Sequence, residues 1–225
     1  MKLIVTDSAE REAMRLFRLD ASIRTEGSAS REIADIVEDE WRAVHPDEPI
    51  NRRHIGIDVL PADSWPLAVG AMSVPPSDLT ADHLRARTLA ATLADEMLSA
   101  DAILLAIPLY NFGVSQHAKT WIDLVMTDPR AGNGAQLLAG RKVVLVTVRG
   151  GAYGPGTPRE GWDHATGYLT RILTDVWGAD LTVVEREFTL VGVNPALDAF
   201  TDLASQLHSG ARDSAREVGK ALAVA

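Results

Sequence analysis

Three segments of the sequence combine residue types that could hold a planar, phosphorylated ligand. The first, ASIRTEGSAS at residues 21–30, carries Ser22, Ser28 and Ser30 around Gly27. Hydroxyl groups and unpaired N–H groups at the start of a helix bind phosphate, because the helix dipole favours negative charge there. Serine is also a common N-cap residue, so capping alone explains the same pattern. The segment lacks the GxGxxG motif of dinucleotide-binding proteins and the GxxxxGKS/T motif of nucleoside-triphosphate-binding proteins. A ligand with a single phosphate monoester is therefore the better fit.

The second and third segments could form the walls of a ring site. PLYNFG, at residues 108–113, follows an apolar run. Its proline and glycine end the strand, so backbone amides there are not paired with a neighbouring strand and need other partners. Tyr110 and Phe112 could form a flat wall, although packing in the core or in a dimer contact explains them equally well. The third segment, residues 147–161, contains Arg149, Gly150 and Gly151. Paired glycines let a backbone approach a planar ligand, whereas a plain surface loop with a solvated arginine is the alternative.

The elements between these segments indicate an α/β fold, a doubly wound parallel sheet with helices on both faces in a single domain. Apolar periodicity predicts helices at 29–44, 79–99, 116–126 and 160–177, and one or two more at 195–223. Strands are predicted at 15–21, 54–60, 102–107, 143–148 and 181–184, with a long surface loop at 61–78. Loops that follow parallel strands gather at one edge of the sheet, so the fold would bring the three segments together.

The start of the domain allows two interpretations. MKLIVTDS resembles a first strand with its loop, but MRLFRLDAS, which begins at Met14, has the better loop after it. We therefore expect residues 1–13 to be an N-terminal extension and the domain to span residues 14–225.

Composition and charge argue against several classes of protein. The formal net charge is −9, and the sequence has no run of Lys or Arg of the kind that binds a nucleic-acid backbone or an anionic membrane. Nucleic acid and membrane partners are therefore not expected. The sequence has no stretch of about 18 apolar residues, and its first apolar run is too short for a signal peptide. The absence of cysteine excludes disulfides and thiolate metal sites, and the six histidines show no HxxxH or HxH spacing, so no metal is expected. We expect a cytoplasmic protein.

The three segments resemble the FMN-dependent NADH:quinone oxidoreductases and azoreductases of flavodoxin-like fold. The likeness rests on the Ser-x5-Ser-x-Ser spacing, on PLYNFG continuing through a serine and a lysine into an aromatic-Asp-Leu helix, and on RGG. It covers most of the chain from about Met14. In that family the first segment binds the FMN phosphate and the other two contact the isoalloxazine ring. The resemblance therefore implies a cofactor site formed by Ser22, Ser28, Ala29, Ser30, Leu109, Tyr110, Asn111, Phe112, Val148, Arg149, Gly150 and Gly151.

The resemblance also implies an oxidoreductase that binds FMN tightly and forms a homodimer whose partner chain helps to wall the site. NADH or NADPH would reduce FMN, and a quinone or azo compound would then take both electrons in a ping-pong mechanism. The cofactor carries the hydride chemistry, so no catalytic side chain is assigned. Leu109, Val148 and Tyr153 depart from the common Met, Ser and His of the family, which bears on flavin potential rather than on FMN binding. The alternatives are a flavodoxin-type electron carrier without NADH activity and a protein that kept the fold but lost the cofactor.

Overall fold

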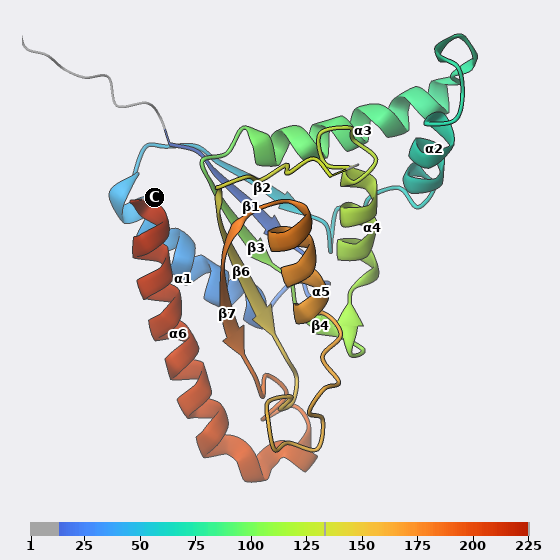
Figure 1. Ribbon diagram of the computed structural model, residues 1–225. Coiled ribbons are helices and arrows are strands. Elements are labelled where there is room, and N and C mark those ends of the chain that lie inside the picture. Colours follow the sequence, from blue (N-terminus) through green and yellow to red (C-terminus); the bar gives the residue numbers. More distant parts are fainter. Residues whose placement is uncertain (1–13, 133, 225) are drawn as a thin grey trace, which may run out of the picture.

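A five-stranded parallel sheet forms the centre of the protein in a computed structural model that describes residues 14–132 and 134–224 (Figure 1). Its strands are β1 (Leu16–Asp20), β2 (Ile50–His54), β3 (Ala102–Ala106), β6 (Lys142–Val148) and β7 (Asp180–Arg186). Their order in the sheet is β2-β1-β3-β6-β7. The predicted doubly wound α/β fold is confirmed. The predicted extension at residues 1–13 lies outside the described residues.

Helices cover both faces of this sheet. On one face, α1 (Ala29–Val44) and α6 (Thr201–Ala223) pack together. The other face is covered by α3 (Ala81–Leu98), α4 (Gln116–Val125), α5 (Thr166–Thr170) and the π-helical segment η2 (Arg171–Val176). A shorter helix, α2 (Ser64–Ala71), packs against α3, and the 3-10 turns η1 (Pro76–Asp78) and η3 (Pro195–Phe200) precede α3 and α6. The two apolar cores on the opposite faces leave the carboxyl edge of the sheet free to build a site.

Two close contacts fix how the helices lie against their neighbours. α6 can approach α1 closely because residue 219 is glycine: a Cβ there would lie 2.8 Å from the Val37 carbonyl oxygen. On the other face, Trp121 of α4 meets Trp177, the residue after η2, edge to face. Their ring centroids are 5.8 Å apart and both side chains are fully buried.

The prediction for residues 54–78 is wrong in two respects. The second strand runs from Ile50 to His54, not from 54 to 60, and the residues after it turn, leaving Ile57 47% and Val59 54% exposed. β2 lies at an edge of the sheet, where a half-exposed strand can have the polar sequence INRRH, so hydropathy did not reveal it. The predicted loop at 61–78 contains α2 and η1. α2 lacks a one-sided apolar stripe, which is the pattern that identifies helices in sequence.

The helix predicted at 160–177 starts late. The structure begins α5 at Thr166, and before it Asp163 holds a turn by accepting hydrogen bonds from the N–H groups of Ala165 (2.8 Å) and Thr166 (2.9 Å). The chain then continues as the π-helical η2 rather than as an α-helix.

β1 is buried along its whole length although its sequence alternates apolar and polar residues. The guanidinium group of Arg18 is fully buried and pairs with Asp20 (3.1 Å), Asp35 (2.6 Å) and Glu38 (2.9 Å). A buried charge needs such partners, since an unpaired one would cost several kcal/mol. The alternation therefore reflects an internal ion-pair cluster rather than a solvent-facing side of the strand.

Candidate functional site

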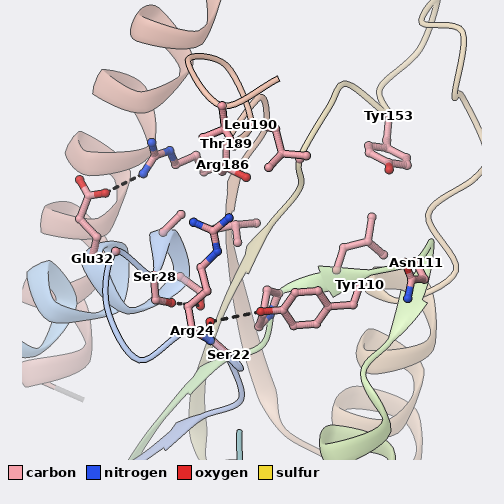
Figure 2. Close-up of a pocket in the computed structure, with 18 of the residues that line it drawn as sticks. Ser22, Arg24, Ser28, Glu32, Tyr110, Asn111, Tyr153, Arg186, Thr189 and Leu190 are labelled. Carbon is pink, nitrogen blue, oxygen red and sulfur yellow. Dashed lines mark hydrogen bonds and ion pairs between the residues drawn. The ribbon is translucent and has the colours of Figure 1, made fainter. Parts of the chain in front are cut away.

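A cavity of about 660 Å³ opens at the carboxyl edge of the sheet, where the loops after β1, β3, β6 and β7 meet (Figure 2). Its volume is in the range of small-molecule and cofactor sites. The cavity is lined by most of the residues predicted to bind a cofactor: Ser22, Ser28, Ala29, Ser30, Leu109, Tyr110, Asn111, Phe112, Val148 and Gly150. The structure thus brings together three segments that are far apart in the sequence.

The β1–α1 loop presents hydroxyl groups at the start of α1. Ser28 is the N-cap, and its Oγ accepts a hydrogen bond from the Arg31 N–H at 3.4 Å. Ser28 and Ser30 are both buried, and their hydroxyls share a hydrogen bond of 3.2 Å. The capping interpretation and the anion-site interpretation are therefore compatible, because the cap uses one lone pair of the Ser28 hydroxyl, and Ser28, Ala29 and Ser30 at the start of α1 all line the cavity.

Tyr110 connects the second segment to the first. Its hydroxyl lies 3.2 Å from the Ser22 Oγ and accepts a hydrogen bond from the Ile23 N–H at 3.3 Å. Besides lining the cavity, the side chain therefore fixes the β1–α1 loop relative to the strand that follows β3.

The PLYNFG segment is a β-hairpin rather than a simple strand-ending turn. β4 (Leu109–Tyr110) pairs antiparallel with β5 (Gly113–Val114) through a two-residue turn. Asn111 and Phe112 in this turn both have positive φ, 47° and 69°. Positive φ at both central positions is typical of a type I′ turn, but for phenylalanine it is strained. Strain of this kind gathers at functional sites, and here it holds both side chains at the cavity.

Two of the predicted cofactor residues, Arg149 and Gly151, are not among the lining residues of the cavity. The buried guanidinium of Arg149 pairs with Asp163 (2.6 Å), Glu185 (2.5 Å) and Glu187 (3.5 Å). Arg149 therefore ties the loop between β6 and α5 to the end of β7 and to the residue after it, beside the cavity. Gly151 is also buried, and its carbonyl accepts a hydrogen bond from the Phe188 N–H.

Position 150, which lines the cavity, is glycine because a neighbouring side chain occupies the space that its Cβ would take. A Cβ at this position would lie 2.6 Å from the Leu190 Cδ1, so Leu190 packs directly on the glycine. Thr189 holds the same loop, donating hydrogen bonds from its N–H and its hydroxyl to the Arg149 carbonyl, both at 3.1 Å. Both residues belong to the chain after β7, which the sequence patterns did not link to the site.

Charged residues at the hydroxyl side of the cavity were also missed. Figure 2 shows Arg24, Ser28 and Arg186 on one side of the cavity, with Asn111 and Tyr153 on the other. Arg186 ends β7 and pairs with Glu32 of α1 at 2.7 Å. It lies two residues beyond the predicted strand 181–184, so the rule that strand ends meet at one edge could have found it. No sequence motif identified Arg24, because a single arginine in a loop belongs to no recognisable spacing of residues.

Glu32 stays ionised beside this cavity. Burial would raise the pKa of its carboxyl, but the hydrogen bond with His208 and the ion pair with Arg186 outweigh burial and lower it. Glu32 thus holds Arg186 in place.

The comparisons with known proteins identify the family of the chain. A family model described as flavodoxin-like fold matches residues 14–207. The FMN-dependent NADH:quinone oxidoreductase of Frankia casuarinae is 39% identical over 204 residues, which cover 89% of this chain and 96% of the relative. The chain belongs to the family of FMN-dependent NADH:quinone oxidoreductases. The resemblance inferred from the three segments is therefore confirmed.

Other members and structural neighbours extend the match. The family member from Kineococcus radiotolerans is 36% identical over 214 residues, covering 92% of this chain and 99% of its own. The FMN-dependent NADH-azoreductase of Bacillus anthracis, solved in complex with FMN, superposes with a TM-score of 0.72 at 17% identity and covers 91% of this chain and 99% of its own. At that identity it supports the flavodoxin-like fold alone.

Within residues 14–132 and 134–224, no three His, Asp or Glu side chains gather closely enough to hold a metal ion. No helix in this part of the chain has the length and apolar character to cross a membrane.

Proposed function

We propose that the chain is an FMN-dependent oxidoreductase that transfers two electrons from NADH or NADPH to quinones or azo compounds by a ping-pong mechanism. The observation that carries this proposal is one cavity lined by a hydroxyl loop at a helix N-terminus, an aromatic hairpin and a glycine floor. In this proposal the hydroxyl loop binds the phosphate of FMN, the aromatic hairpin contacts the edge of its ring, and the glycine lies at the ring face. Membership of a family named for FMN and NADH supports the same assignment.

The hydroxyl side of the cavity suits a phosphate dianion. Ser28 and Ser30 offer hydroxyls at the positive end of α1, and the guanidinium groups of Arg24 and Arg186 add charge. Because Glu32 is paired with Arg186 and His208, its carboxylate is compensated. Glu32 lines the same side of the cavity, so its carboxylate also offsets the charge of Arg186, and Arg24 and the N-terminal end of α1 supply the positive charge there.

The opposite side of the cavity suits a planar ring. In the proposal, the hairpin turn at Asn111 and Phe112 orients the ring edge, and Gly150 with Leu190 packed on it borders the ring. Leu109 and Val148 have no polar side-chain atoms, so their backbone groups would make the hydrogen bonds. FMN, when bound, would supply the two-electron chemistry, and the side chains of the protein bind, orient and shield it.

An absorbance experiment tests the proposal. Purified protein supplied with FMN should retain it and be yellow, bleach on anaerobic addition of NADH, and regain its colour with menadione. Initial rates with NADH and NADPH would then give the preferred donor. Protein that cannot retain FMN overturns the proposal. Protein that retains FMN but does not oxidise NADH favours the electron-carrier alternative.

We further propose that the protein acts as a homodimer in the cytoplasm, where NADH is available. The support for a dimer is a group of exposed apolar side chains on the projecting α2–α3 arm (Figure 1). Trp65 and Val69 of α2, Met72 directly after it and Leu84 of α3 are 43–62% exposed. Exposed apolar groups of this kind mark interaction surfaces.

A further inference from the structure

An aromatic cluster with a cation lies at the mouth of the cavity, across from the phosphate side. The guanidinium carbon of Arg159 lies 5.7 Å from the ring centroids of both Phe112 and Tyr153. Trp162 meets Phe112 edge to face at 5.5 Å. Of these residues, Phe112, Tyr153 and Arg159 line the cavity.

This cluster is poorly explained as core packing. Phe112 is 39% and Trp162 51% exposed, so both rings are left partly in water. Phe112 is also held there at a strained positive φ. Water-exposed rings held in a costly backbone conformation are the arrangement expected of a surface that stacks a planar ligand.

The charge of Arg159 is available to a ligand. Among the described residues no carboxylate forms an ion pair with it, whereas the nearby Arg149 pairs with three. Within the described chain, the guanidinium group makes one hydrogen bond, from Nη1 to the Tyr153 hydroxyl at 3.3 Å. A guanidinium group has five N–H donors, so most of them remain free.

We propose that Arg159 binds an anionic group, a sulfonate or carboxylate, carried by a planar aromatic electron acceptor. Phe112 and Tyr153 would stack on the acceptor, and the guanidinium would pair with its anion, a geometry that arginine makes bidentate. The inference rests on the proposed function, since it names the class of acceptor for the same site. It also explains how a chain of net charge −9 could accept an anion at this cavity.

Kinetics with matched acceptors test the inference. Turnover of FMN-loaded protein is measured with menadione, which is neutral, and with 1,4-naphthoquinone-2-sulfonate. Arg159→Gln should raise KM for the sulfonate roughly tenfold, as expected for one lost charge-assisted contact, and leave KM for menadione within about twofold. Arg159→Lys should recover part of the loss. Arg171→Gln, which removes an equal charge from an exposed residue of η2, should change neither value.

A binding measurement separates recognition from turnover. Calorimetry on the FMN-loaded protein compares naphthalene-2-sulfonate with the neutral naphthalene-2-sulfonamide. The sulfonate should bind more tightly to the wild type, and Arg159→Gln should abolish that difference.

Three outcomes would overturn the inference. The first is an equal loss of affinity for both acceptors in Arg159→Gln, and the second is no preference of the wild type for the sulfonate over the sulfonamide. The third is a raised KM for NADH alone, which would assign the contact to the donor's pyrophosphate. Absence of menadione turnover in the wild type is a different result, because it counts against the proposed function itself.

Discussion

At the scale of single residues, Arg149 and Asp163 show how a side chain can serve a site without lining it. The Asp163 carboxylate accepts two backbone N–H groups at the start of α5 and pairs with Arg149 at 2.6 Å. Burial would raise the pKa of Asp163, but these hydrogen bonds, the Thr166 hydroxyl and Arg149 together lower it. A carboxyl with a depressed pKa in the folded state stabilises that state as long as it is ionised.

Asp163→Asn should therefore lower the free energy of unfolding at pH 7 by about 2 kcal/mol, since it removes one charge partner of a buried arginine that keeps two others. The wild-type advantage should be complete above the ordinary aspartate pKa of about 4. It should disappear as the pH falls through the lower pKa of the folded state. Urea unfolding over a pH series measures the difference, with the exposed Asp47→Asn as the control. A difference that does not change with pH would contradict this role.

Ser28 permits a test of the phosphate position. Ser28→Glu would place a negative charge at the N-terminus of α1 and should weaken FMN binding by roughly a hundredfold through like-charge repulsion. Riboflavin, which has no phosphate, should be affected far less. Ser28→Ala is the matched variant, because it removes the cap without adding charge. Equal effects on FMN and riboflavin would exclude this loop as the phosphate site.

At the scale of elements, hydropathy predicted the helices and strands that bury an apolar face in the core. Strands β3 and β6 and helices α1 and α4 are found within about a residue of their predicted bounds, because each buries a strong apolar pattern. β2 and α2 were missed, since an edge strand and a helix without an apolar stripe carry little such signal. The β4–β5 hairpin was missed as well: its turn is Asn-Phe, and type I′ turns are usually recognised by Asn-Gly.

The same division holds for the site. The serines, the residues of the PLYNFG segment and Gly150 were predicted as site residues because their types form a recognisable combination, although the hairpin itself was not. Arg24 and Arg159 reach the cavity through long side chains from loops, which no sequence pattern marks, whereas Arg186 lies at a strand end that the sheet topology brings to the site.

Gly56, in the turn after β2, tests how one element supports another. A Cβ at this position would lie 2.2 Å from the Ser22 carbonyl oxygen, so the turn can touch the β1–α1 loop only as glycine. Gly56→Ala should displace that loop, lower FMN affinity and reduce the unfolding free energy by about 1–3 kcal/mol. Thermal unfolding and FMN titration measure both effects. Gly210→Ala, whose Cβ would enter open space on α6, is the control and should be neutral or slightly stabilising. Normal FMN affinity in Gly56→Ala would show that the loop is positioned independently.

At the scale of the whole molecule, the proposed dimer should depend on the α2–α3 arm. Val69→Asp would place a charge among exposed apolar side chains and should shift the protein from dimer to monomer by at least roughly tenfold in dissociation constant. Sedimentation velocity over a concentration series measures this shift. Leu203→Asp, at a similarly exposed position on α6, should leave the assembly unchanged. A wild type that is monomeric at micromolar concentration would contradict the proposed dimer. Dissociation in Leu203→Asp but not in Val69→Asp would place the interface on α6 instead of on the α2–α3 arm.

The buried Trp121–Trp177 pair also has an optical consequence. Two indole rings 5.8 Å apart and nearly perpendicular, at 85°, form a fixed chiral arrangement whose electronic transitions couple. Near-ultraviolet circular dichroism should therefore carry a signal specific to the contact between α4 and the end of η2. Trp162, exposed beside the cavity, is the tryptophan whose emission a bound flavin would quench. One chain thus contains two separate spectroscopic reporters, one for packing behind the sheet and one for occupancy of the cavity.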